Sequence, residues 1–220
     1  MSHRIPLFIG SLLLLASCGS SVQMSYNLTS DVEDATRNGI LFQATERVLT
    51  RRLAAVQVES PVVTVIPQGG NSATATISVP DSFAADVERI TSDPFTFDIR
   101  VEEGTVKNEE GTEETIWSLT GVDGTMLEWI EPIQGANDNQ VGVELQFTEE
   151  GRAKLATVFS KQKGRNIGIF VRDLLVSKLK INSDKPNERI IISGIPSEKV
   201  AQIFADDVNV GLHISFSASK

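Results

Sequence analysis

The residue types that most often carry chemistry are scarce in this 220-residue chain. It contains one cysteine, Cys18, and two histidines, His3 and His213. One cysteine cannot form an intrachain disulfide, and this inventory leaves little for a zinc site or a Cys–His pair. His213 is expected at the surface, on the polar side of a C-terminal strand. The chain also lacks a Gly-x-Ser-x-Gly elbow, a phosphate-binding glycine loop and a His-Glu-x-x-His motif.

Carboxylates are more frequent, but their spacing does not favour catalysis or metal binding. Asp206 and Asp207 are adjacent near a helix end, so their side chains are not expected to face one another. The glutamates of segment 102–115 lack the alternating Asp/Asn–Gly pattern of a calcium loop. No particular serine is placed near a particular lysine, as a Ser–Lys hydrolase would require. We therefore expect no enzymatic activity, no metal site and no cofactor.

The position of Cys18 suggests a different role. Arg4 and His3 precede the apolar stretch 5–15, and small residues follow it, which is typical of a secretory signal peptide. The stretch is shorter than the roughly 20 apolar residues of a spanning helix. Leu15-Ala16-Ser17-Cys18 resembles the bacterial lipobox, which implies cleavage between Ser17 and Cys18 and attachment of diacylglycerol and palmitate to Cys18. Several acyl chains give stable anchoring.

The charge balance narrows the set of partners. The chain has 20 Lys and Arg against 29 Asp and Glu, a net charge of −9. Removal of residues 1–17 removes Arg4 and no acidic residue, so the mature charge is −10. An acidic chain is a poor ligand for nucleic acid and for anionic lipid head groups. The mature chain is long enough to bury a core.

The first half of the chain shows a mixed pattern of helices and strands. A first strand is indicated over 23–28, and apolar residues at three- and four-residue steps predict a helix over 31–56. Alternation predicts a hairpin formed by 61–66 and 73–79 around a Pro-Gly-rich turn. A short helix follows Pro80, and 95–101 alternates as a strand.

The second half has the same character. Strands are predicted over 141–147, 166–171, 173–181 and 189–193, and a final strand over 210–216. Thr148 and Ser197 are the expected N-caps of two helices. Trp117 and Trp129 are interpreted as packing residues. The whole pattern favours an α+β fold with mostly antiparallel sheets.

An ordered series of segments resembles SecD, a subunit of the membrane machinery that assists the bacterial Sec translocase. Segment 141–156 is similar to the strand and Glu-Glu-Gly helix of the head in the first large periplasmic domain of SecD. Segments 164–171 and 191–204 match the strand, Ile-Ser-Gly and helix that follow. The sequences around 47–53 and 61–63 resemble the base of that domain.

The resemblance implies a base with an inserted head. The corresponding boundaries are a signal peptide (1–17), a tether and possible first strand (18–30), a base (31–101), an acidic linker loop (102–116), a head (117–208) and a C-terminal strand returning to the base (209–220). This chain lacks the spanning helices of SecD, and Arg172-Asp173-Leu174 replaces the usual Asp-Gly turn. Proton-coupled pulling is therefore not carried over.

Two hypotheses follow for the function. In the first, a lipid-anchored SecD-like module binds unfolded polypeptide or Sec translocase components without catalysis, through an apolar groove between head and base. In the second, the chain is a structural or envelope-assembly lipoprotein that keeps only the fold. Either protein would sit at the cell membrane or the outer membrane, facing the periplasm or the cell exterior. Residue 19, directly after Cys18, is Gly and not the Asp that retains many lipoproteins at the inner membrane. An outer-membrane location is therefore allowed.

Overall fold

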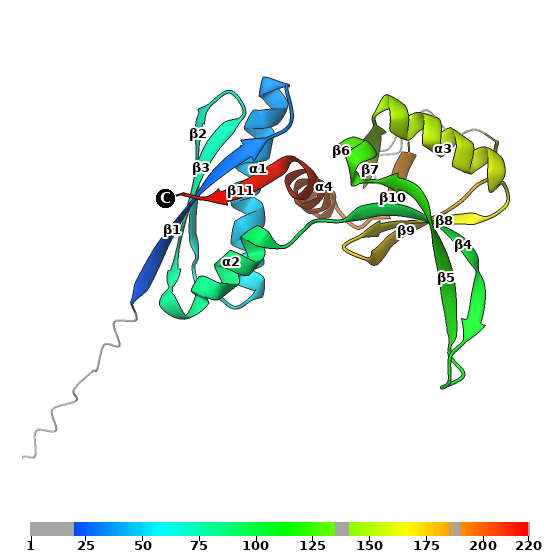
Figure 1. Ribbon diagram of the computed structural model, residues 1–220, viewed down its shortest axis with the longest axis horizontal. Helices are drawn as coiled ribbons and strands as arrows, with labels where there is room; N and C mark the ends of the chain where they lie inside the picture. The colour runs from blue at the N-terminus through cyan, green and yellow to red at the C-terminus, as the bar shows by residue number, and fades with distance from the viewer. Residues whose placement is uncertain (1–19, 135–140, 185, 187–189, 220) are drawn as a thin grey trace, which may run out of the picture.

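A computed structural model describes residues 20–134, 141–184, 186 and 190–219. The expected signal peptide and Cys18 lie outside these residues. The described chain forms two lobes with the long helix α4 (Glu198–His213) between them (Figure 1). Every strand pairing is antiparallel, which confirms the predicted α+β class. In the described segments, no helix is long and apolar enough to cross a membrane.

The first lobe, called the base here, is a four-stranded sheet covered on one face by helices. Its strand order is β11-β1-β3-β2, from β1 (Ser21–Ser30), β2 (Val62–Gly69), β3 (Ser72–Pro80) and β11 (Ile214–Ala218). Helix α1 (Ala35–Ala55), capped by Asp34, packs its apolar stripe on the inner face, with α2 (Ala84–Ser92) and the short turn Asp81–Phe83 alongside. The predicted helix 31–56 and hairpin are confirmed.

The second lobe, the head, contains the other two sheets. One has the order β5-β4-β8-β9, from β4 (Phe97–Lys107), β5 (Glu113–Asp123), β8 (Asn166–Val171) and β9 (Leu174–Lys180). The other has the order β10-β7-β6, from β6 (Leu127–Gln134), β7 (Val141–Phe147) and β10 (Ile190–Ile195). Helix α3 (Glu149–Lys161) and the turn Gly124–Met126 complete it, and Thr148 caps α3 as predicted.

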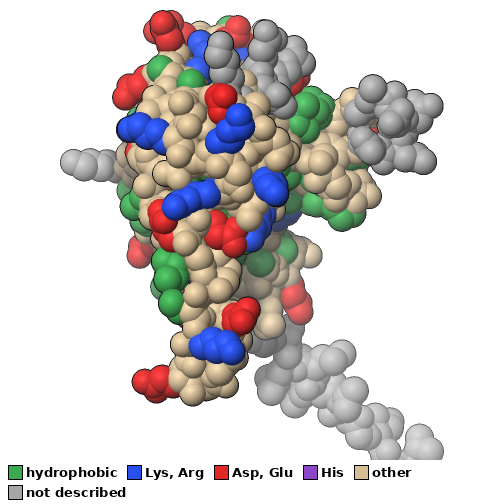
Figure 2. Space-filling view, turned by 90° about the vertical axis from the view of Figure 1, so that its right-hand side faces the viewer, with side chains coloured by type: hydrophobic (Ala, Val, Ile, Leu, Met, Phe, Trp, Pro, Cys, Tyr) green, Lys and Arg blue, Asp and Glu red, His purple; other side chains and the backbone are tan. Residues whose placement is uncertain are grey.

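The acidic segment, assigned to a linker and expected as a solvated loop or the tip of a long hairpin, forms a long hairpin. Strands β4 and β5 pair from Asp98 to Lys107, and only a tight turn around Asn108 to Thr112 joins them. The hairpin projects from the head, and charged side chains mark its tip (Figure 2). Glu102 bonds with Lys178 and Asn166, while Glu103 bonds with Ser118 and Arg165, and these bonds lower the pKa of both carboxyls. Cross-strand partners therefore hold glutamates that looked like loop residues.

Two expectations are wrong in detail. The strand predicted over 95–101 was assigned to the base, but β4 pairs with β5 and β8 and its inward residues join the head core. The C-terminal strand was predicted from Val210, but α4 continues to His213 and only β11 returns to the base. Alternating apolar residues at 210–216 also fit the last turn of a helix followed by a short strand, so periodicity over so few residues did not separate the two.

Helix α4 belongs to both cores. Ala201, Ala205 and Val208 are buried in the head core, whereas Val210 is buried in the base core. Asn209 fixes the helix to β6, because its amide accepts a hydrogen bond from Ile130 N (2.9 Å) and donates one to Ile130 O (2.8 Å). Both groups are buried, so this pair of bonds satisfies an edge-strand backbone that water cannot reach.

An ion-pair cluster joins α4 to α1. Arg47 donates through two nitrogens to Asp206, at 2.9 and 3.0 Å, and this bonding raises the pKa of Arg47. Arg51 lies 3.6 Å from Asp206 and 3.3 Å from Asp207, and Arg52 lies 3.4 Å from Asp207. The Asp206 side chain is only 2% exposed, so its charge depends on these partners.

The Arg47–Asp206 pair should be strongly coupled. We predict that Arg47→Met lowers the free energy of unfolding by about 2–3 kcal/mol, because it strips a buried carboxylate of its bidentate partner. The double variant Arg47→Met/Asp206→Leu should recover most of that loss in urea denaturation. Arg89→Met, which breaks a solvent-exposed pair with Asp86, is the control and should cost less than about 0.5 kcal/mol. Additive single-variant losses would contradict the coupling.

Candidate functional site

Of the site residues predicted from the sequence, the structure describes His213 but not Ser17 and Cys18. The prediction that His213 lies at the surface on a strand is wrong. His213 ends α4, stacks on Trp129 with ring centroids 6.1 Å apart, and has a side chain that is only 10% exposed. Its Nδ1 lies 2.8 Å from Asp31 Oδ1. The extension of α4 turns this residue inward toward the base core.

Asp206 and Asp207, the adjacent carboxylates of the sequence analysis, both lie on α4. Asp206 and Asp207 bind mainly different arginines, in agreement with the expectation that adjacent helical residues do not face one another. Over the described ranges, no group of three His, Cys, Asp or Glu side chains is placed to hold a metal ion.

The most unusual apolar surface is the edge strand β9. Among the strands that the structure describes, β9 pairs with β8 alone, so no described strand covers the backbone groups of its other edge. Its first three residues are exposed: Leu174 by 70%, Leu175 by 46% and Val176 by 39%. Proteins usually protect such edges with charges, bulges or coverage, because they pair readily with other extended chains. The sequence pattern predicted this strand, but not that it would be an open edge.

The turn before β9 is held by charged contacts. Arg172 and Asp173 have positive φ angles of 50° and 61°, as a two-residue turn of type I′ requires. Neither is the glycine or asparagine that adopts this conformation most easily. Arg172 donates to Asp93 and stands over the ring of Phe95, and Asp173 accepts from Arg100. Arg172 thus fastens the hairpin tip to residues 93–96, called the crossing segment here, which run from the base to the head. Asp173 fastens the tip to β4.

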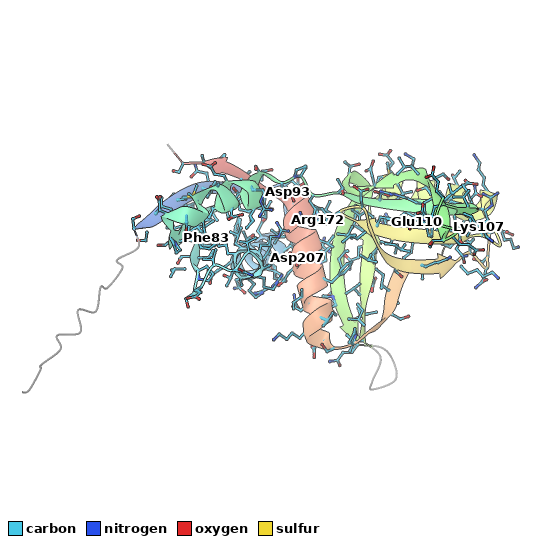
Figure 3. All side chains as sticks on the ribbon, turned by 90° about the horizontal axis from the view of Figure 1, so that it is seen from below. Phe83, Asp93, Lys107, Glu110, Arg172 and Asp207 are labelled. Atoms are coloured by element: carbon cyan, nitrogen blue, oxygen red, sulfur yellow. The ribbon has the colours of Figure 1, made fainter. Side chains whose placement is uncertain are left out.

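A cleft of about 480 Å³ lies beside this turn, between the lobes. Its apolar wall combines Ile90 of the base, Phe204 of α4, and Leu174 and Val176 of β9. Its rim is charged, and Asp93, Arg172 and Asp207 lie close together beside α4 (Figure 3). Burial and the charge of Arg172 lower the pKa of Arg52, another rim residue. The cleft thus combines apolar lining residues with charged ones.

Phe95 lines both this cleft and a second cleft of about 690 Å³. Its ring lies against α4 at Gly211, where a Cβ atom would come within 2.3 Å of the ring. A side chain at position 211 would push Phe95 away from the helix. The glycine therefore allows the crossing segment to form a common wall of both clefts.

Comparisons with known proteins agree with this architecture at the level of fold. No protein-family model and no curated protein matches the chain. Several solved structures are similar to it. A SecDF structure described as a membrane component that enhances protein export is 18% identical, with a TM-score of 0.46, over 90% of this chain and 98% of that chain. SecDF in a super-membrane-facing form is 18% identical, with a TM-score of 0.48, over 91% of this chain.

SecDF of Thermus thermophilus, described as a translocon-associated membrane protein, is 18% identical, with a TM-score of 0.50, over 89% of this chain. This chain spans about 30% of the length of that protein and of the super-membrane-facing form. The resemblance to the SecD periplasmic domain, read from ordered sequence segments, thus extends to the three-dimensional fold.

Proposed function

We propose that this protein is a lipid-anchored, extracytoplasmic binding module that holds an extended segment of unfolded polypeptide along β9 and the adjoining cleft. The observation that carries the proposal is the open edge of β9 with three consecutive exposed apolar residues. An extended chain that adds to such an edge gains main-chain hydrogen bonds, and alternate side chains enter the neighbouring pockets. No reaction is required of the site.

A second edge strand shows why β9 is favoured. Strand β2 also exposes large apolar residues, Val62 by 61% and Ile66 by 55%. However, Glu46 of α1 accepts a hydrogen bond from Val65 N at 3.2 Å, so a side chain already covers part of that edge. Strand β2 also contributes no residue to the cleft of about 480 Å³ beside β9 or to the second cleft of about 690 Å³.

The setting that we propose is protein export. One SecDF of the same fold is described as translocon-associated. An anchor on Cys18 would hold the binding edge near the outer face of the cell membrane or the outer membrane, where exported chains emerge unfolded. Components of the Sec translocase are the corresponding protein partners, and neither a metal nor a cofactor is needed.

The alternative is an envelope-assembly lipoprotein that retains the fold without binding polypeptide. The ionic contact between α1 and α4 favours it, because Arg47, Arg51 and Asp206 fill the centre of the junction with polar groups. That contact lies beside the cleft and does not cover β9. The two proposals therefore differ in one property, which is capture of extended polypeptide.

Capture should depend on the apolar side chains of β9. We predict that Leu174→Asp/Val176→Asp weakens crosslinking of the purified mature chain to reduced, carboxymethylated α-lactalbumin about tenfold or more, because burial of two such side chains contributes a few kcal/mol. Both residues are exposed, so the fold should persist.

The matched control is Val62→Asp/Ile66→Asp on the edge strand β2, which should capture the probe like the unmodified protein. Equal capture by the two double variants would refute the β9 site. Capture by neither the unmodified protein nor any variant would favour the envelope-assembly alternative.

Anchoring should depend on Cys18 alone. We predict that Cys18→Ser prevents incorporation of labelled palmitate in the bacterial host and moves the protein from the membrane pellet to the soluble fraction. Since the chain has one cysteine, no other thiol can replace it. Ser17→Ala, which keeps a small residue before the cut, is the control and should remain labelled. A labelled Cys18→Ser protein would contradict the assignment.

A further inference from the structure

Among the residues that the structure describes, the outward-facing positions of the base sheet carry no charged side chain. Alternation along the strands sends one set of residues toward α1 and the other set outward. The outward set is exposed or half-buried and consists of Ser21, Gln23, Ser25, Asn27 and Thr29 on β1, Ser72, Thr74, Thr76 and Ser78 on β3, Val62, Thr64 and Ile66 on β2, and Ser215 and Ser217 on β11.

These residues form continuous rows across the sheet, called the neutral face here. Thr64, Thr76 and Ser25 are in register, as are Ile66, Thr74, Asn27 and Ser217. Because 22% of the chain is charged, roughly three charged residues would be expected among these fourteen positions. Asp81 and Glu59 lie beyond the strand ends.

The rest of the molecule differs. The outward residues of the head sheet include Asp98, Arg100, Glu102 and Lys178, which form ion pairs across its surface. The head end of the molecule shows Lys, Arg, Asp and Glu side chains side by side (Figure 2). The absence of charge is thus a property of the base sheet. This sheet lies at the end of the molecule opposite the head (Figure 1).

We infer that the neutral face rests against the head-group surface of the anchoring membrane; this rests on the lipid anchor of the proposed function. Bacterial membranes carry anionic lipids, and a chain of net charge −10 is repelled from them on its acidic faces. The fourteen positions of the neutral face bring no carboxylate of their own within a Debye length, about 8 Å at physiological salt, while Asp81, whose N–H bonds to Ser20 O, lies at the Ser21 end of the face. Its hydroxyl and amide groups can bond to head groups and water.

The length of the tether supports the same contact. The face begins at Ser21, three residues after Cys18 in the sequence. Three residues span at most about 11 Å, so an acylated Cys18 keeps the start of β1 at the lipid surface. With the neutral face against that surface, the head at the opposite end would stay clear of the lipid (Figure 1).

The test uses the single thiol as a chemical anchor. The chain from Cys18 onward, produced without a signal peptide, is coupled to maleimide-bearing lipid in vesicles of phosphatidylglycerol and phosphatidylcholine. Hydroxyl-radical footprinting then measures oxidation of exposed apolar side chains. Val62 and Ile66 report on the neutral face, while Leu119 and Leu174 report on the head. This anchor does not depend on lipidation in the cell or on polypeptide capture, so the outcome is separable from both.

Coupling should reduce oxidation of Val62 and Ile66 severalfold relative to the free chain and leave Leu119 and Leu174 unchanged. Thr74→Glu/Thr76→Glu should restore oxidation on these vesicles by repulsion, whereas the neutral control Thr74→Gln/Thr76→Gln should stay protected. Unchanged oxidation of Val62 and Ile66 on coupling would overturn the inference. Protection that appears in the free chain as its concentration rises would also overturn it, in favour of contact with a second copy of the chain.

Discussion

The arrangement of the two lobes depends on helix α4, which has side chains buried in both hydrophobic cores. Helix α4 places Ala201, Ala205 and Val208 in the head core and Val210 in the base core, and Asp206 lies between them, almost fully buried. A buried carboxylate is tolerated only where its charge is compensated, and the bidentate bond from Arg47 does this. Such a pair adds little net stability compared with apolar packing, but it penalises any arrangement in which α1 and α4 separate. The ion pairs therefore set how the two lobes meet.

The geometry of the cleft follows from that fixed contact. Since α4 sets the position of the head, the β8–β9 turn reaches the crossing segment, where Arg172 meets Asp93 and covers Phe95. Leu174 and Val176 of β9 thereby line the same cleft as Phe204 and Ile90. A rigid edge is also a better template for an extended chain than a mobile one, because less conformational entropy is lost on binding.

Much of the fold could be predicted from local chemistry. Thr148 and Ser197 were expected to cap helices, and each accepts a bond from a backbone N–H three residues later. The β8 strand was predicted at 166–171 because its residues are almost all apolar, and it is central in its sheet. These features depend on neighbours in sequence, where capping and periodicity act.

The features that make the candidate site were harder to predict, because they depend on distant partners. Alternation identified Phe97 to Val101 as a strand but could not show that its partner is β8. Among the described strands β9 has no second neighbour, and no local pattern encodes this. Asp206 gave no sign of its burial, since its arginine partner lies 159 positions earlier in the chain. Each of these properties is tertiary.

Because α4 is packed in both cores, the base and the head should unfold as one cooperative unit. This can be tested with Trp117→Phe and Trp129→Phe, because Trp117 packs on Phe170 in the head and Trp129 lies in the base core. Each variant keeps one fluorescent reporter: Trp117, which lies within the head, or Trp129, which lies on the head strand β6 but packs in the base core. The account predicts that urea unfolding followed by tryptophan fluorescence coincides with unfolding followed by far-ultraviolet circular dichroism in both variants. A fluorescence transition in either lobe that is displaced from the dichroism transition would contradict it.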